Sequence, residues 1–225
     1  MRQMSEAHFA ILRRHMVEVI AIHAELAEED LGKGVLDPRV PSAMAHVPRH
    51  RFVPSALAAL AYHDAPLPIG FDKTISQPFM VAVMTDLLAP LPSDSVLEVG
   101  AGLGYQTAIL ARLVGRVWSV EVVEELALEA EGCLTRLGCA NVDIRVGDGS
   151  RGWAKHSPFD KILVAAAADL VPPALVDQLR PGGRMVLPLG GEEAQALTVV
   201  DKDHRGRVSS RQLVPVRFGR LETMV

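Results

Sequence analysis

The glycine-rich segment "VLEVGAGLGYQ", residues 96–106, constrains the fold of this chain more than any other feature. An apolar run leads directly into Gly100, Gly102 and Gly104, and a helical pattern begins just after them. Glycine allows a sharp turn and lets a ligand approach the backbone without a Cβ in the way. The segment therefore predicts a strand that ends in a ligand-binding turn and is followed by a helix.

Short apolar runs alternate with amphipathic stretches from Pro78 onward, as in "SVLEVG", "RVWSVE", "NVDIRVG" and "FDKILVAAA". Strands and helices that alternate at this spacing indicate βαβ units and a largely parallel sheet covered on both faces. The segment 195–218 predicts a hairpin around "DHRGR", with antiparallel strands that close the sheet. The predicted fold class is therefore α/β, doubly wound and mostly parallel.

The segment before this pattern is expected to be largely helical. Residues 5–30 predict one amphipathic helix that stops at "GKG", and "SAMAHV" predicts a second, short helix. The apolar face of the first helix is expected to consist of Phe9, Leu12, Met16, Ile20, His23 and Leu26. We expect a single domain over 1–225, in which 1–76 form a helical cap and a substrate-side loop over the ligand-binding edge and 77–225 form the cofactor-binding core.

Net charge and cysteine content argue against several partners and kinds of site. A net charge of −4 leaves no basic excess to neutralise phosphates, so nucleic acid is not expected as the main partner. The basic clusters at 13–15 and 49–51 are expected to be exposed. Cys133 and Cys139 have neither zinc spacing nor a disulfide framework, which predicts reduced thiols, no metal site and a cytoplasmic protein. No apolar run is long enough for a signal peptide or a membrane span.

Acidic residues at three strand ends favour a cationic nucleoside as the ligand. The glycine spacing is G-x-G-x-G, unlike the dinucleotide pattern, and Glu98 would repel a pyrophosphate but suits an ammonium group, directly or through water. Glu121, at the end of the next strand, can accept hydrogen bonds from ribose hydroxyls, although a helix dipole would also favour an acid there. Asp148 can reach an adenine amino group, while Gly149 keeps its loop tight. S-adenosyl-L-methionine fits this pattern better than a nicotinamide dinucleotide.

Six segments, in order from about residue 35 to about residue 200, resemble the protein-L-isoaspartate O-methyltransferase family. They are "VPRHRFVP", "LPIGFDKTISQPFMVAVMTDLL", "VLEVGAGLGYQTAILARL", "GDGSRGW", "PFDKILVAAAA" and "QLRPGGRMVLPLG". The resemblance implies a class I S-adenosylmethionine-dependent methyltransferase fold. It also implies methyl transfer to the α-carboxylate of L-isoaspartyl residues in damaged proteins and peptides, which initiates their repair.

The resemblance also assigns site residues. Ser76 matches the family's active-site position, and we expect its hydroxyl and nearby backbone N–H groups to hold the carboxylate. Thr74 and Ile75 are expected to border the methionine end of the cofactor, and Ser76 is also placed to cap the helix that begins near Pro78. The predicted cofactor-binding set is Thr74, Ile75, Glu98, Gly100, Gly102, Gly104, Gln106, Glu121, Asp148 and Gly149.

The chain departs from the family pattern at Asp72 and Lys73, where a Gly-Gln pair is common, and in its ending "VRFGRLETMV". Asp72 and Lys73 are expected to form a solvated pair, and His46 and His50 to be packing or surface residues. Three other functions stay open: a carboxyl methyltransferase for a dedicated peptide or small acid, a non-catalytic S-adenosylmethionine-binding module, and a nicotinamide-dependent oxidoreductase. The sequence gives no indication of the oligomeric state.

Overall fold

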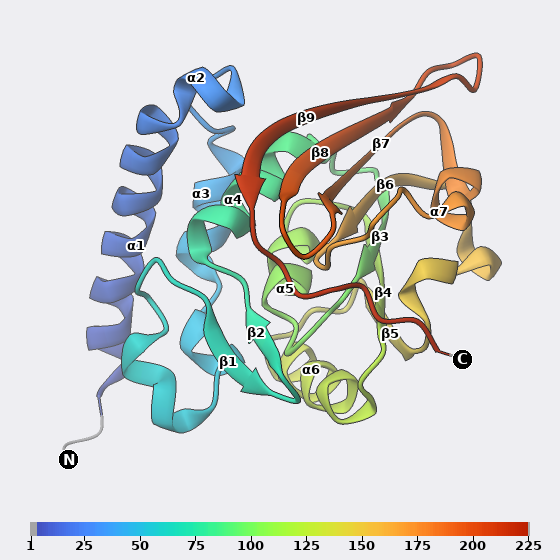
Figure 1. The fold of residues 1–225 in the computed structure, drawn as a ribbon. Coiled ribbons are helices and arrows are strands. Elements are labelled where there is room, and N and C mark those ends of the chain that lie inside the picture. The colour runs from blue at the N-terminus through green and yellow to red at the C-terminus, as the bar shows by residue number, and fades with distance from the viewer. Residues whose placement is uncertain (1–3, 225) are drawn as a thin grey trace.

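The computed structural model describes residues 4–224, which form a twisted seven-stranded sheet flanked by helices (Figure 1). The sheet order is β5-β4-β3-β6-β7-β8-β9. Its strands are β3 (Ser95–Val99), β4 (Arg116–Glu121), β5 (Val142–Val146), β6 (Phe159–Val164), β7 (Leu179–Gly190), β8 (Gln195–Lys202) and β9 (Val208–Val216). The helices are α1 (Glu6–Leu26), α2 (Glu28–Leu31), α3 (Arg39–His46), α4 (Pro78–Leu88), α5 (Tyr105–Ala111), α6 (Glu124–Arg136) and α7 (Pro173–Gln178).

Five neighbouring strands, from β5 to β7, are parallel, which confirms the predicted doubly wound α/β fold. The chain runs outward from β3 to β5, returns to β6 beside β3, and then continues to β7. The order of strands therefore reverses between β3 and β6, the place where open α/β sheets bind ligands at the carboxyl ends of their strands.

The predicted C-terminal hairpin is present as β8 and β9, which pair antiparallel with each other, while β8 also pairs with β7. The side chain of Asp203 fixes the connecting turn because its Oδ1 accepts hydrogen bonds from the backbone N–H groups of Arg205 and Arg207, at 2.8 and 2.9 Å. This hairpin extends beyond the rest of the sheet at the upper right of Figure 1.

The predicted N-terminal helix is present but is interrupted. Helix α1 begins at a capping box formed by Ser5 and His8 and ends at Leu26, and the short α2 follows after Ala27. Phe9, Met16 and Ile20 are buried as expected, whereas Leu26 is 80% exposed, so its place on the apolar face was wrong. Ala24, which lies one turn after Ile20, occupies that position instead.

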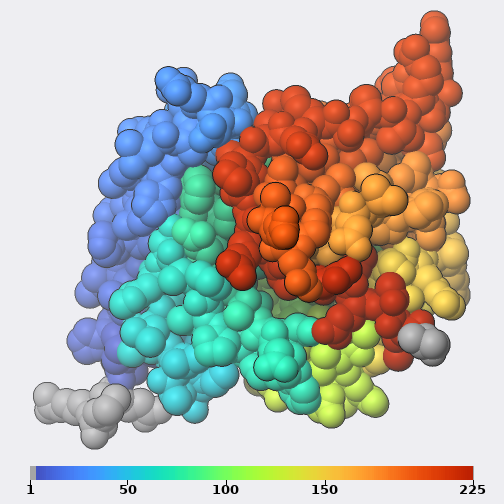
Figure 2. Space-filling view, in the orientation of Figure 1, coloured from blue at the N-terminus to red at the C-terminus, as the bar shows by residue number. Residues whose placement is uncertain are grey.

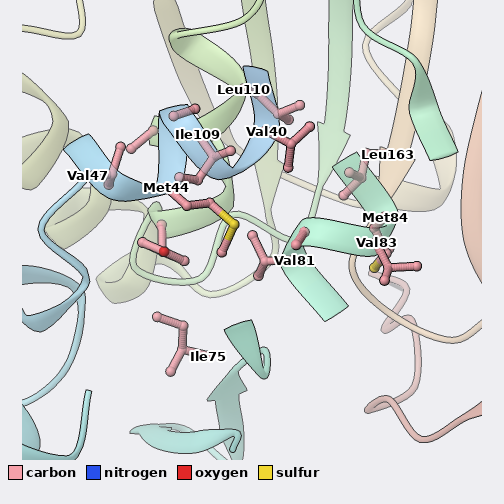
Figure 3. Close-up of a cluster of buried hydrophobic side chains, with 14 of the residues drawn as sticks. Val40, Met44, Val47, Ile75, Val81, Val83, Met84, Ile109, Leu110 and Leu163 are labelled. Carbon is pink, nitrogen blue, oxygen red and sulfur yellow. The ribbon is translucent and has the colours of Figure 1, made fainter. Parts of the chain in front are cut away.

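One continuous hydrophobic core joins the N-terminal helices to the sheet. Figure 3 shows Met44 of α3, Val81 of α4, Ile109 of α5 and Leu163 of β6 within one cluster. Helix α1 packs beside α3 and α4 and lies away from the carboxyl ends of the strands (Figure 1). This differs from the expectation that the N-terminal helices cover the ligand-binding edge, because the apolar face of α1 is used against these two helices.

Two further short strands carry the chain from this helical layer toward the strand ends. β1 (Leu67–Gly70) and β2 (Lys73–Ile75) form an antiparallel hairpin where the sequence predicted only a loop. Phe71 and Asp72 form the turn and have φ values of 53° and 55°, as a two-residue hairpin turn requires. Neither residue is glycine, which is why the local sequence gave no hairpin signal. No helix within residues 4–224 is long and apolar enough to span a bilayer.

Candidate active site

A cavity of about 720 Å³ opens at the carboxyl ends of β3, β4 and β6, where the sheet order reverses. Three parts of the chain line it: the β1–β2 hairpin with the start of α4, the ends of the parallel strands, and the segment after β9. Figure 2 shows the hairpin, in teal, and the C-terminal segment, in red, on the same face of the molecule. Of the predicted site residues, the cavity is lined by Thr74, Ser76, Gly100, Gly102, Glu121 and Gly149.

The glycine turn after β3 adopts the geometry that the sequence predicted. Gly100, Gly102 and Gly104 have φ values of 89°, 55° and 94°, a region in which side chains are strained. Gly100 and Gly102 line the cavity. Gly104 does not line it, and a Cβ there would lie 3.1 Å from Leu134 and 3.3 Å from Ala130 of α6. Gly104 therefore serves close packing between the turn and α6.

Glu121, at the end of β4, lines the cavity and supports the glycine turn. Its Oε2 accepts a hydrogen bond from the Gly102 N–H at 2.7 Å, and its Oε1 accepts from the N–H groups of Val122 and Val123 at 2.9 and 3.1 Å. A carboxylate has about four acceptor positions, so Glu121 retains capacity for a ligand hydroxyl. The predicted role of this residue toward a ribose is compatible with its position.

The loop after β5 reaches the cavity through Gly149, whereas the side chain of Asp148 does not line it. A Cβ on Gly149 would lie well inside the contact distance of Val99, so only glycine allows this approach to β3. Burial works against ionisation of Asp148, but hydrogen bonds from the Ser150 hydroxyl and N–H hold its pKa below the usual value. The Asp148 carboxylate is thus occupied within its own loop.

Glu98 lies behind the glycine turn, fully buried, and does not line the cavity. Its Oε2 accepts hydrogen bonds from the hydroxyls of Thr107 and Ser119, both at 2.6 Å, and its Oε1 has no hydrogen-bond partner among residues 4–224. Burial raises the pKa of Glu98 to about 7, and the two hydroxyls only partly oppose this. The free oxygen is a buried acceptor that a ligand ammonium group or a water molecule could satisfy.

Two other predicted cofactor residues have their side chains directed into the protein. Gln106 is buried on α5 and donates from Nε2 to the Thr85 hydroxyl of α4 at 2.8 Å. Ile75 packs with the hydrophobic cluster near Met44 and Val81 (Figure 3). Neither side chain lines the cavity, so their predicted contacts with a cofactor are not made by these side chains. Alternation along β2 explains Ile75, because its neighbours Thr74 and Ser76 line the cavity instead.

Ser76 lines the cavity directly before α4, but it does not cap that helix as expected. Asp64 takes the capping role: its Oδ1 accepts a hydrogen bond from the Phe79 N–H at 2.8 Å. Its Oδ2 accepts from Gln77 Nε2 at 2.9 Å and lies 2.7 Å from His23 Nδ1 of α1. The Ser76 hydroxyl is therefore not used as a helix cap.

Arg49 was expected to be exposed, and the structure corrects this because its side chain is completely buried. Its Nε donates to the Ala61 carbonyl and its Nη2 donates to the Ser76 carbonyl, both at 2.7 Å. The guanidinium also lies over the ring of Tyr105, 4.8 Å from the ring centre. Burial lowers the pKa of Arg49 to about 10, which leaves it charged at neutral pH. Nothing in the local sequence distinguishes Arg49 from its exposed neighbour Arg51.

His46 and His50 occupy surface and packing positions as expected, but His50 is buried although its basic cluster was expected to be exposed. His50 stacks on Phe9 with ring centres 3.9 Å apart, and its Nδ1 lies 2.8 Å from the Tyr62 hydroxyl. His46 lies on the surface of α3, with Nδ1 beside the Ser42 carbonyl. Both residues lie outside the set that lines the cavity.

The C-terminal segment supplies a wall of the cavity that the sequence did not predict. Residues 215–222 line it, and the Leu221 N–H donates to the Ala167 carbonyl at 2.7 Å. Lys73 of the hairpin forms an ion pair with Glu222 instead of the expected pair with Asp72. The hairpin and the C-terminal segment are thus joined across the cavity.

The same chain segments match a known family of proteins. The family model described as Protein-L-isoaspartate(D-aspartate) O-methyltransferase (PCMT) matches residues 21–223. The chain belongs to this family. It is 55% identical to Protein-L-isoaspartate O-methyltransferase 1 of Polaromonas sp. over 97% of this chain and 93% of that protein. It is also 53% identical to Protein-L-isoaspartate O-methyltransferase 2 of Syntrophobacter fumaroxidans, over 93% of this chain and 85% of that protein.

A solved protein-L-isoaspartate O-methyltransferase superimposes with a TM-score of 0.80 at 26% identity, over 92% of this chain and 65% of that one. The chain therefore spans less than two thirds of that solved structure. Membership of the PCMT family confirms the fold class, the enzyme class and the cofactor that the resemblance implied. The protein is an S-adenosylmethionine-dependent methyltransferase that acts on isoaspartyl residues.

The residues that line the cavity, together with Glu98 behind the glycine turn, fit the PCMT cofactor. The glycine turn leaves room for a nucleoside against the backbone, Glu121 offers acceptors for a ribose, and the buried Glu98 Oε1 lacks a partner that a cationic group would supply. Among residues 4–224, no group of three or more His, Cys, Asp or Glu side chains is placed to hold a metal ion.

Proposed function

We propose that this methyltransferase holds the α-carboxylate of an isoaspartyl residue at Ser76 and the N-terminus of α4, facing the methionine end of S-adenosylmethionine. One observation carries the proposal: Ser76 lines the same cavity as Gly100, Gly102 and Glu121, although it precedes them in sequence and belongs to a different structural layer. A hydroxyl and a nucleoside cradle therefore share one cavity.

The bound cofactor supplies a methyl group on a positively charged sulfur, which is open to attack by an oxygen nucleophile. The attacking group is a carboxylate whose ordinary pKa lies several units below neutrality, so it is ionised without help. The protein therefore needs no general base, and its task is to orient the carboxylate in line with the methyl group and to exclude water. In this mechanism the Ser76 hydroxyl donates a hydrogen bond to one carboxylate oxygen and leaves the other free to attack.

The N-terminus of α4 supports the same binding mode. Pro78 has no N–H, the Phe79 N–H is bound by Asp64, and Met80 lies at the cavity wall. The positive end of the helix dipole favours an anionic group beside the first turn. Asp64 already places a carboxylate at this N-terminus, so α4 adds little further field and the Ser76 hydroxyl supplies the main contact with the substrate carboxylate.

Within this proposal the cofactor is held by the glycine turn, by Glu121 at the ribose and by the loop of Asp148 and Gly149 at the adenine. Thr74 lies at the cavity wall and would border the methionine end. Glu98 would act on the amino group of the cofactor from behind the turn, through water. The contributions of Gly104, Gln106 and Ile75 would be indirect, through packing of the turn, α5 and the hairpin.

The proposed partners are damaged proteins and peptides that carry isoaspartyl residues, and the proposed location is the cytoplasm. Free thiols at Cys133 and Cys139 and the acidic net charge support this placement. Nucleic acid is not proposed as a partner.

Labelled S-adenosylmethionine, offered with matched isoaspartyl and aspartyl peptides, tests the substrate class. We expect label to enter the isoaspartyl peptide alone. Transfer to both peptides would indicate a broader carboxyl methyltransferase. Transfer to neither, with cofactor binding intact, would overturn the proposed repair function in favour of another acceptor or a binding role.

The Ser76→Ala variant tests the proposed role of the hydroxyl. We expect kcat to fall roughly a hundredfold, as when one aligned hydrogen-bond donor is removed from other active sites. The Kd of S-adenosylhomocysteine, measured by calorimetry, should remain within about threefold because the glycine turn and Glu121 are untouched. A parallel loss of cofactor binding would contradict this role.

A further inference from the structure

Two buried side chains of opposite charge, Arg49 and Asp64, form hydrogen bonds with the chain between Ser76 and Phe79. Arg49 donates to the Ser76 carbonyl at 2.7 Å, and Asp64 accepts from the Gln77 side chain at 2.9 Å and from the Phe79 N–H at 2.8 Å. The side chain of Asp64 is only 9% exposed, and Arg49 is completely buried. The segment 76–79 is thus tied to the protein interior at three successive points.

Each support is itself held by a separate element. Arg49 belongs to a short 3₁₀ helix, Arg49–Phe52, and is fixed by the Ala61 carbonyl and by the ring of Tyr105 on α5. Asp64 is bonded to His23, which lies on α1. The position of Ser76 therefore depends on elements that do not line the cavity themselves.

These hydrogen bonds are made by charged, buried side chains, which a surface segment does not need in order to fold. A hydrogen bond with an ionised partner is shorter and stronger than a neutral one, and burial of a charge is costly unless the charge is well paired. Arg49 retains Nη1 without a hydrogen-bond partner among residues 4–224, so its burial is not fully compensated. The energetic cost of burying Arg49 beside the active-site serine therefore indicates a functional role for this residue.

We propose that Arg49 and Asp64 are positioning residues for methyl transfer, which fix the Ser76 hydroxyl in line with the methyl group, and that α1 supports Asp64 through His23. This inference rests on the proposed role of Ser76. In-line transfer depends steeply on geometry, so a shift of about 1 Å in a positioned group can cost about a hundredfold in rate. The charged side chains would prevent that shift while contacting neither substrate nor cofactor.

The variants Arg49→Lys and Asp64→Asn test the proposal, because each keeps the size and polarity of the side chain. Lysine cannot hold the Ala61 and Ser76 carbonyls with the fixed fork of a guanidinium. The asparagine side chain of the second variant has one acceptor oxygen where aspartate has two, and it lacks the charge. We expect kcat to fall about tenfold to a hundredfold, with KM for the isoaspartyl peptide and Kd for S-adenosylhomocysteine each within about threefold.

Matched controls separate positioning from stability. Arg51→Lys changes the exposed neighbour of Arg49, which pairs with Glu6. Asp86→Asn changes a carboxylate on α4 that is also buried, accepts the Asp37 N–H at 2.7 Å and pairs with Lys33. Asp86→Asn should lose thermal stability about as much as Asp64→Asn, Arg51→Lys should lose little, and both controls should retain kcat within about twofold.

Amide hydrogen exchange provides a readout that does not depend on activity. In Arg49→Lys and Asp64→Asn, the amides of 76–80 should exchange faster while those of β3 and β4 stay protected. Should Arg49→Lys fail to fold, Asp64→Asn carries the same test.

The proposal is overturned if both variants lose no more kcat than their controls, or if cofactor affinity falls in step with kcat. An unchanged kcat in Ser76→Ala would instead reject the proposed function of Ser76 itself. The two failures are therefore distinguishable.

Discussion

The two sides of the cavity are built by different means. On the cofactor side, three glycines within residues 100–104 shape the turn, and the Gly102 N–H binds Glu121, nineteen residues away. On the substrate side, Ser76 is held from Arg49, twenty-seven residues away, and Lys73 pairs with Glu222 across 149 residues. The first side is encoded in a compact motif, whereas the second is assembled only when distant segments meet.

This difference has an energetic meaning. A glycine turn fails when one Cβ is added, because backbone atoms have nowhere to move. A long-range side-chain support can lose one bond and still leave the chain folded. We therefore expect abrupt failure on the cofactor side and graded loss on the substrate side, and four substitutions test this contrast.

The largest effect should come from Gly149→Ala. The added methyl group would overlap Val99 of β3, so the loop must move away from the cavity. We expect cofactor affinity to fall at least about a hundredfold, measured by calorimetry with S-adenosylhomocysteine. Gly191→Ala is the control, because a Cβ there has no atom within 4 Å. Near-normal affinity of Gly149→Ala would show that the cofactor side is as adaptable as the substrate side.

Glu98→Gln should produce the next largest effect, and it depends on pH. Burial raises the pKa of Glu98 from 4.5 to about 7, so the folded protein retains a proton that the unfolded chain releases in this range. The stabilisation from Glu98 is therefore complete below about pH 4.5 and is lost as pH rises through about 7. Glutamine stays neutral at every pH. The free energy of unfolding of the variant should therefore rise relative to that of the wild type between about pH 5 and about pH 8, by on the order of 3 kcal/mol.

Denaturant unfolding of the unliganded protein across this pH range measures the effect. A stability difference that does not change with pH would show that Glu98 titrates normally. With cofactor present, the wild type should be more stable than Glu98→Gln above about pH 7. An ionised Glu98 attracts the amino group of the cofactor, whereas glutamine does not.

Glu121→Gln should weaken cofactor binding about tenfold. The amide can replace only one of the two carboxylate oxygens that receive the N–H groups of Gly102, Val122 and Val123. Binding by calorimetry measures the loss, with the exposed Glu124→Gln on α6 as the matched control. Equal affinity in the two variants would remove Glu121 from the cofactor side.

The smallest effect should come from Lys73→Met. The Lys73–Glu222 pair is partly exposed, and such pairs contribute at most about 1 kcal/mol. We expect cofactor dissociation to accelerate about twofold to fivefold, and the difference from wild type to shrink as salt rises. Glu222→Gln should behave alike, and the double variant should add little. Additive effects would mean that the two residues act separately.

The same contrast explains what could be predicted from the sequence. The alternation of strands and helices, the glycine turn and Glu121 follow from local periodicity and spacing, and the structure places them as expected. Arg49 and Asp64 could not be found in this way, because burial of a charge depends on residues that approach only after folding. Ile75 lies between two cavity residues in sequence and Gln106 lies four residues after Gly102, but strand and helical geometry directs their side chains inward.

The N-terminal helix shows a second limit of predicting structure from the spacing of apolar residues. Its apolar spacing predicted a buried face, and Phe9, Met16 and Ile20 lie there, but the spacing does not name the partner surface. The structure places that face against α3 and α4, and the polar His23 of the same helix contacts Asp64, which supports the Ser76 segment.

The wall formed by residues 215–222 also bears on the order in which the enzyme becomes functional during synthesis. Translation proceeds from the other end, so the sheet strands and the serine can all emerge before this last wall exists. In a nascent chain that lacks this wall, the cavity would be open to water on one side and would bind S-adenosylmethionine weakly. Competence for transfer would then arise only after residues 215–222 have been synthesised.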